Sequence, residues 1–240
     1  MNPTTAAGPR PAILIPARPV VPSRARVLHY LGYRRGRTRA TPAAMETVER
    51  ASELARRLAV PRAAVFTCAV AGAGPDGVAL ATGDVLRSRR LAEGLAGSRA
   101  VTVAVLTLGP AIDEALDALF ARNEHALAVA VDAAGSAAVE AWLGEVRARV
   151  AREAAGAGLR LTDPFGPGYA DWDPAALAGL LELAGGDRIG VGTTSGGALV
   201  PRKSAAVVLG WAGDRPAAPL SGCGACDRVD CAYRLPPRGA

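Results

Sequence analysis

The residues with the clearest capacity for chemistry are three cysteines near the C-terminus. Cys223, Cys226 and Cys231 follow a Cys-x2-Cys-x4-Cys spacing, so their thiolates are close enough to share one ion. Zinc and iron–sulfur clusters both take such ligands. A closed site needs a fourth ligand, which Cys68 supplies only if the fold brings it near. The spacing favours a bound metal ion or cluster over free thiols or a redox pair, and the identity of the ion stays open.

A second candidate site is the turn at 166–172. Pro167 presets φ at the first corner residue and Gly168 permits a positive φ at the second, so a type II turn is expected. Tyr169 and Trp172 follow, which places two aromatic rings and several free backbone N–H groups at one spot. The plain alternative is a well-formed loop whose aromatic rings close over the core.

A helix is expected to begin directly after this turn. Asp173 has the side chain of an N-cap and Pro174 suits the first helical position. The positive end of the helix would then lie beside the turn. The corner therefore suits a small ligand that carries an anionic group and a ring able to stack.

Other polar residues give weaker signals. Ser195 lies in a hydroxyl-rich glycine tract, 193–197, that matches no phosphate-loop pattern, and Lys203 is expected to be a solvated loop cation. Asp132 and Glu140 are eight residues apart on one expected helix, hence on roughly the same face. Most such pairs are solvated, although the Ala-rich surroundings leave room for inward-facing carboxylates.

The elements that must position these residues alternate irregularly along the chain. Helices are expected at 42–59, 88–96, 109–120, 123–155 and 174–184. Strands are expected at 27–33, 63–70, 78–81, 100–107, 189–194 and 205–211. The strand 100–107 is Val-rich and apolar on both faces, which predicts a central position. A large helical block between groups of strands fits an α+β fold better than a doubly wound sheet.

Charge and composition divide the chain into a basic tail at 1–22, a domain at 23–214 and a cysteine-containing segment at 215–240. The first 40 residues hold eight Arg and no Asp or Glu, which gives them a charge of +8. Because the whole chain has a net charge of +6, the other 200 residues sum to −2. Such a segment could meet an acidic protein surface, and nucleic acid is a minor alternative because no binding module is present. With no secretory signal and no apolar run of about 18 residues, a cytoplasmic protein without a membrane partner is expected.

Several short motifs occur in an order and spacing that resemble one family. They are VLHYLGY at 27–33, TLG at 107–109, DAAGSAAVE at 132–140, PGYADW at 167–172, PRKS at 201–204 and the cysteine segment at 223–234. The chain from about 25 to 234 is similar to stand-alone relatives of the activation domain of cobalamin-dependent methionine synthase. No single motif is decisive, but six in sequence are fairly specific.

The resemblance implies an α+β fold with a twisted, mainly antiparallel sheet and a central helical block. It implies binding of S-adenosylmethionine and docking onto a partner methyltransferase that presents cobalamin. With an electron donor, the oxidised cob(II)alamin is then reductively methylated. The chain would be an accessory module of methionine synthase activity more than an independent enzyme.

The resemblance also assigns site residues. Pro167, Gly168 and Tyr169 match the family's ligand-binding turn, and Glu140 is the candidate for its acidic ligand contact. The resemblance further includes Lys203 and Ser204 of the PRKS segment, and Ser195 of the loop upstream of it, among the ligand-binding residues.

One departure stands beside the turn. Pro164 occupies the position where the family pattern places an Arg for the ligand carboxylate. Arg160, or an arginine elsewhere, would have to replace it. The alternative function is therefore a metal or iron–sulfur electron-transfer or partner-binding protein for a corrinoid enzyme that no longer binds S-adenosylmethionine.

Overall fold

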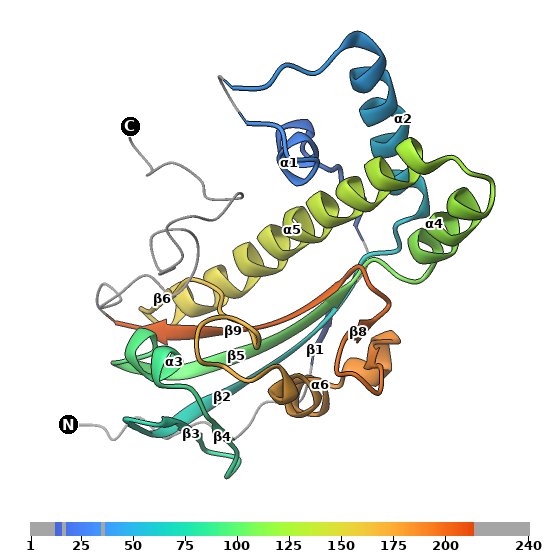
Figure 1. Cartoon of the computed structure of the whole chain (residues 1–240). Helices are drawn as coiled ribbons and strands as arrows, with labels where there is room; N and C mark the ends of the chain where they lie inside the picture. The colour runs from blue at the N-terminus through green and yellow to red at the C-terminus, as the bar shows by residue number, and fades with distance from the viewer. Residues whose placement is uncertain (1–12, 16–17, 35–36, 214–240) are drawn as a thin grey trace.

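The centre of the fold is a twisted antiparallel sheet (Figure 1). The computed structural model describes residues 13–15, 18–34 and 37–213, and within them the sheet has seven strands in the order β4-β3-β2-β5-β9-β6, with β1 also paired to β2. The strands are β1 Ile13–Ile15, β2 Arg62–Gly74, β3 Gly77–Leu80, β4 Val85–Leu86, β5 Ser98–Thr107, β6 Arg160–Leu161 and β9 Ser204–Ala212. The predicted central position of the Val-rich strand is confirmed, because β5 lies between β2 and β9.

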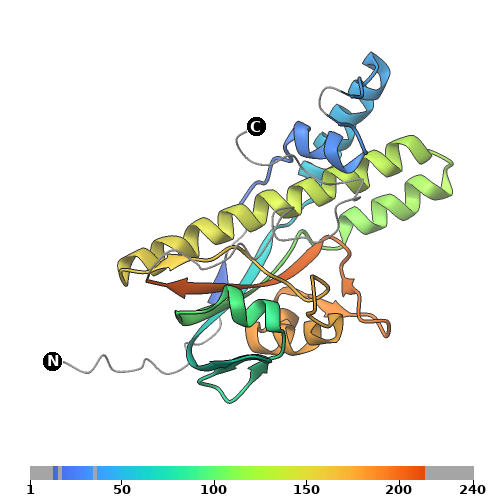
Figure 2. The same cartoon turned by 60° about the vertical axis from the view of Figure 1, so that its left-hand side comes forward.

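Helices cover both faces of this sheet, as Figures 1 and 2 show. On one face lie α1 Arg24–Tyr30, α2 Pro42–Leu58, α4 Ala111–Ala121 and α5 His125–Gly156. On the other lie α3 Arg89–Gly94 and α6 Leu177–Ala184, with 3-10 turns at Pro174–Ala176 and Gly186–Ile189. A small hairpin of β7 Gly192–Thr193 and β8 Leu199–Val200 precedes β9. The predicted α+β class with a mainly antiparallel sheet and a helical block is confirmed.

The alternation of side chains along the strands builds two cores. Ala63 and Val65 of β2 face the α5 side, whereas Ala64 and Phe66 face the α6 side, because successive strand residues point to opposite faces. Trp142 of α5 is buried in the first core, where its indole N–H donates to the Arg62 carbonyl at 3.0 Å. The sheet thus separates the molecule into an α5 face and an α6 face.

The helix α5 is long and apolar enough, by length and composition alone, to cross a membrane. Half of its apolar window is buried inside the fold. It packs against α1, α2, α4 and strands of the sheet. Its apolar surface is therefore used in the manner of a core helix.

Two predicted strands are wrong. Residues 27–33 were expected to form a strand, yet 24–30 form α1, so His29 lies on a helix. A short apolar run fits either period, and here Val27 is buried against α5 from a helix. In the predicted strand 189–194 only Gly192–Thr193 is extended, because the chain makes a 3-10 turn and then takes positive φ at Gly190.

Part of the stretch assigned to a basic tail is built into the fold. β1 pairs in antiparallel register with residues 63–65 of β2. Ile15 and Val20 are buried in the α5-side core. The packed domain therefore begins before residue 23.

Candidate functional site

The predicted type II turn is present at the corner that follows β6. Gly168 has φ of +90°, and the Tyr169 N–H donates to the Gly166 carbonyl at 3.3 Å across the turn. The N–H groups of Gly168 and Trp172 donate to the Trp172 and Tyr169 carbonyls at 2.8 and 3.0 Å. These three N–H groups are therefore bonded within the turn and are not the free donors that the sequence predicted.

The two aromatic rings of the corner have different environments. Trp172 is 2% exposed and stacks on Phe165, with ring centroids 5.7 Å apart and an interplanar angle of 9°. Tyr169 is 69% exposed and is tilted against Phe165 at 6.4 Å. Trp172 therefore anchors the corner to the α6-side core, while Tyr169 presents a ring that a ligand could stack on.

Asp171 fixes the corner to the start of α3. Its carboxylate accepts hydrogen bonds from the Ser88 hydroxyl at 2.9 Å and from the N–H groups of Arg89 and Arg90 at 2.7 and 3.2 Å. Partial burial acts to raise the pKa of Asp171, but these hydrogen bonds outweigh it and hold the pKa below its usual value. The Asp in the PGYADW motif thus has a structural role.

The helix start after the corner is present in a modified form. The Asp173 carboxylate accepts from the Ala175 N–H at 2.8 Å, as an N-cap does. The chain then forms the 3-10 turn Pro174–Ala176 before α6 begins. The N–H groups of Ala175 and Ala176 at this helix start therefore already donate to Asp173 and are not available to an external anion.

Glu140 lies on α5 and faces α1. The Arg26 guanidinium holds its carboxylate through two hydrogen bonds, the one from Nε measuring 2.5 Å, and the Tyr30 hydroxyl donates to it at 2.6 Å. The hydrogen bond to Glu140 is the main cause of the raised pKa of Arg26. The pKa of Tyr30 is also raised, mainly by burial and next by its hydrogen bond to the Glu140 carboxylate. Burial and the charges of Arg26 and Arg34 lower the pKa of His29 on the same helix. The predicted ligand contact is therefore already the centre of an ion-paired cluster.

Arg147 is a residue that the sequence did not single out. It lies two helical turns after Glu140 on α5, and its guanidinium is 3.5 Å from both the Thr162 carbonyl and the Asp163 carboxylate. These two residues directly precede Pro164, where the family pattern has its Arg. The i, i+7 spacing from Glu140 was the signal that could have found it.

Lys203 is not the solvated loop cation that the sequence predicted. It is 6% exposed, and its ammonium donates to the Asp132 carboxylate at 2.7 Å and to the Ser136 hydroxyl at 3.1 Å. Its aliphatic stem crosses Gly135, where an added Cβ would come within 2.9 Å of the Lys203 Cε. The DAAGS and PRKS motifs therefore pack on each other.

The remaining predicted residues lie apart. The Ser204 hydroxyl is 2.9 Å from that of Thr107 at the end of β5. Ser195 is exposed in the loop of the β7–β8 hairpin. The structure therefore does not gather all of the predicted ligand-binding residues into one contiguous cluster.

The three-cysteine motif lies outside the described residues. Cys223, Cys226 and Cys231 all fall within 214–240, so the metal site stays a prediction. Among the residues that the structure describes, no group of three or more His, Cys, Asp or Glu is placed to hold a metal ion. Cys68 is buried on β2, and this burial raises the pKa of its thiol.

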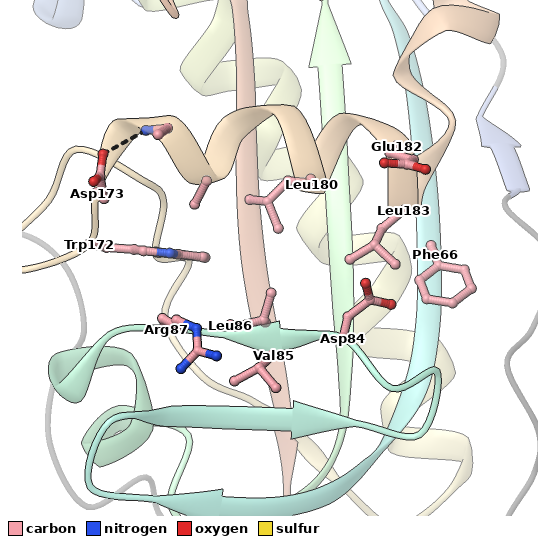
Figure 3. A pocket seen from close by; sticks show the side chains of 13 residues that line it. Phe66, Asp84, Val85, Leu86, Arg87, Trp172, Asp173, Leu180, Glu182 and Leu183 are labelled. Carbon is pink, nitrogen blue, oxygen red and sulfur yellow. Dashed lines mark hydrogen bonds between the residues drawn. The ribbon is translucent and has the colours of Figure 1, made fainter.

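A cavity of about 580 Å³ lies beside the corner, between α6 and the β3–β4 hairpin (Figure 3). Phe66, Leu86, Leu180 and Leu183 contribute apolar side chains to its lining. Trp172 forms part of the wall, so the pocket begins three residues after the exposed Tyr169. Sequence reasoning missed this pocket, because its lining comes from segments far apart in the chain.

The fold and the corner together define an α+β domain in which a type II turn leaves the edge of an antiparallel sheet. This is also the fold of the MetH reactivation domain: a crystal structure of that domain bound to AdoHcy superposes with a TM-score of 0.61 over 92% of this chain and 84% of the other. The two chains share 15% identity, so the likeness shows the fold. No family model matches the sequence, and no curated protein matches it either. The predicted resemblance is thereby confirmed at the level of fold.

Proposed function

We propose that this protein is a reactivation module for a cobalamin-dependent methionine synthase or a related corrinoid methyltransferase, and that it binds S-adenosylmethionine at the turn of Pro167, Gly168 and Tyr169. The observation that carries the proposal is the fold match over 92% of the chain to a reactivation domain bound to AdoHcy. AdoHcy is what remains when S-adenosylmethionine gives up its methyl group. The turn supports the proposal because it has the expected geometry and an exposed ring.

The charges of the amino-acid end of S-adenosylmethionine match two side chains of α5. Glu140 is the proposed partner of the ligand ammonium, and Arg147 the proposed partner of its carboxylate in place of the arginine that Pro164 removes. A carboxylate has about four acceptor positions, and Arg26 and Tyr30 use three of those on Glu140. One position is thus left for a ligand N–H.

The role of the module is positioning. The corrinoid comes from the partner methyltransferase and the electron from a donor protein, so this chain contributes the methyl group at the correct angle and distance. Holding the sulfonium methyl in line with cobalt turns an encounter of two molecules into a reaction within one complex. Accordingly, no catalytic residue is assigned to the chain, which acts in the cytoplasm as an accessory to methionine synthase activity.

The predicted cysteine site belongs to the same proposal. Cys223, Cys226 and Cys231 would bind zinc or an iron–sulfur cluster, with the electron-transfer role as the alternative function. Elemental analysis of the anaerobically purified chain is expected to find one metal site, and Cys226→Ser to lose it. A chain that holds neither metal nor sulfide would remove this part of the proposal.

Calorimetric titration of the full chain with S-adenosylmethionine tests the main proposal. We expect saturable binding that Tyr169→Ala weakens severalfold through the lost ring contact, while Tyr169→Phe retains it. Glu140→Gln should weaken binding of the ligand, since the ammonium loses its charged acceptor. A folded sample that gives no heat at millimolar ligand would rule the proposal out and favour the alternative function.

A further inference from the structure

We infer that the cavity between α6 and the β3–β4 hairpin is a second ligand site, for an elongated zwitterion with an apolar middle, an ammonium at one end and a carboxylate at the other. This site is separate from the proposed S-adenosylmethionine site, whose charged contacts lie on α5. Its volume of about 580 Å³ falls in the range of small-molecule pockets.

The middle of the pocket is apolar on both sides. Leu180 and Leu183 of α6 face Leu86 of β4 and Phe66 of β2 across the cavity (Figure 3). These elements are anchored from outside the pocket, because Leu80 and Ala184 are buried in the α6-side core. A hydrocarbon or aromatic segment of a ligand would displace water from this surface.

The two ends of the pocket differ in charge. Arg87 lies on the side of Trp172, where the Asp173 carboxylate also lines the pocket and accepts from the Ala175 N–H; Asp84 lies with Glu182 toward the other side (Figure 3). Asp84 and Arg87 flank the two residues of β4, which sets their Cα atoms about 10 Å apart at the usual rise per strand residue. Within the described residues Arg87, Asp84 and Glu182 make no ion pair, unlike Glu140 and Lys203. A ligand with a carboxylate toward Arg87 and an ammonium toward Asp84 and Glu182 would complement these groups.

An unpaired donor reinforces the assignment of the carboxylate end. The three tryptophans of the chain are all buried; the indole N–H groups of Trp142 and Trp211 donate to the Arg62 carbonyl and to the Thr102 hydroxyl. The Trp172 N–H has no acceptor, although its ring forms the pocket wall. A buried donor without a partner is destabilising, and a ligand oxygen bound beside Arg87 is the proposed acceptor for it.

The chain offers a way to fill the pocket without disturbing the fold. Gly179 lines the pocket on α6, and an added Cβ there meets no atom within 4 Å. Gly144 on α5 is equally open at its Cβ but lies outside this pocket. Gly179→Leu is therefore the blocking variant and Gly144→Leu its matched control, and both replace a helical glycine by a better helix former.

The test is a calorimetric titration of the full chain with 4-(aminomethyl)benzoate. We expect saturable binding at millimolar concentration, a loss of at least about tenfold in Gly179→Leu, and no change in Gly144→Leu. Failure of the probe to saturate a folded sample, or equal binding by Gly179→Leu and the wild type, would overturn the proposal.

Half-probes assign the two ends. Benzylamine lacks the carboxylate and 4-methylbenzoate lacks the ammonium, so each should bind about tenfold more weakly than the full probe. Arg87→Gln should weaken 4-methylbenzoate but spare benzylamine, and Asp84→Asn should do the reverse. The opposite pattern, or none, would contradict the orientation. Titration of Gly179→Leu with S-adenosylmethionine distinguishes the two proposals. Because this variant blocks only the second pocket, it should bind S-adenosylmethionine as tightly as the wild type does.

Discussion

The α5 face and the corner beside the pocket use their charged groups in different ways. On the α5 face, Glu140 is held by Arg26 and Tyr30, and the buried Lys203 is held by Asp132 and Ser136. At the corner, Tyr169 is exposed, and in the neighbouring pocket Arg87 and Asp84 make no ion pair within the described chain. The contrast teaches that a motif match identifies a residue type but not whether its charge is available to a ligand.

The largest effect is expected from removing the Lys203 charge, which tests whether this residue is held within the fold. Lys203→Met should lower the free energy of unfolding by about 2 kcal/mol, since it deletes a buried charge-assisted hydrogen bond while the half-exposed Asp132 is rehydrated. Urea denaturation measures this loss. If Lys203 contacted only the ligand, stability would stay within about 0.5 kcal/mol of the wild type and only binding would suffer.

The next largest effect concerns Arg147. Arg147→Gln should weaken S-adenosylmethionine binding about tenfold, because a charged partner of the ligand carboxylate is lost. Its contacts to Thr162 and Asp163 are long and half-exposed, so stability should change by less than about 0.5 kcal/mol. Arg160→Gln on β6 tests the other arginine that could replace the one missing at Pro164. Equal weakening by both variants would contradict the assignment of the ligand carboxylate to Arg147.

Asp171 gives a smaller effect with a defined pH dependence. Asp171→Asn should cost about 1 kcal/mol of stability at neutral pH, as removal of a capping group does. Because hydrogen bonds lower the pKa of the folded carboxyl below its unfolded value, this contribution is complete above the unfolded pKa and is lost as the pH falls through the folded one. Thermal unfolding should therefore distinguish the two proteins at neutral pH, and the difference should disappear as the pH falls through the folded pKa of Asp171. A difference that persists in acid would contradict the capping role.

Ser195 should give the smallest effect. It is exposed in the β7–β8 loop, where the backbone is held by Thr194 and Ala198. Ser195→Ala is expected to change stability by less than about 0.5 kcal/mol, and S-adenosylmethionine binding should remain as in the wild type. A clear loss of binding, measured by the same calorimetry, would place this hairpin at the ligand and extend the site beyond the corner.

Local chemistry allowed much of the fold to be predicted. The helix predicted at 42–59 is present as α2, and the Thr41 hydroxyl caps it by accepting from the Ala44 N–H. The Pro167–Gly168 turn has the predicted dihedral angle, because a Pro and a Gly restrict their own backbone wherever they occur. The apolar 27–33 was misassigned since a short run of that kind fits a helix and a strand equally well.

By itself, the sequence determined the α+β class, the central Val-rich strand and the type II turn, because each depends on residues that are neighbours in the chain. Only the tertiary structure decided which charged side chains are paired with each other inside the fold. Glu140 meets Arg26 across 114 residues and Lys203 meets Asp132 across 71, and no local preference encodes which distant side chains will touch. The same holds for the pocket, whose walls come from β2, β4 and α6. Packing brings those segments together, and packing decides whether a carboxylate is paired within the fold or open to a ligand.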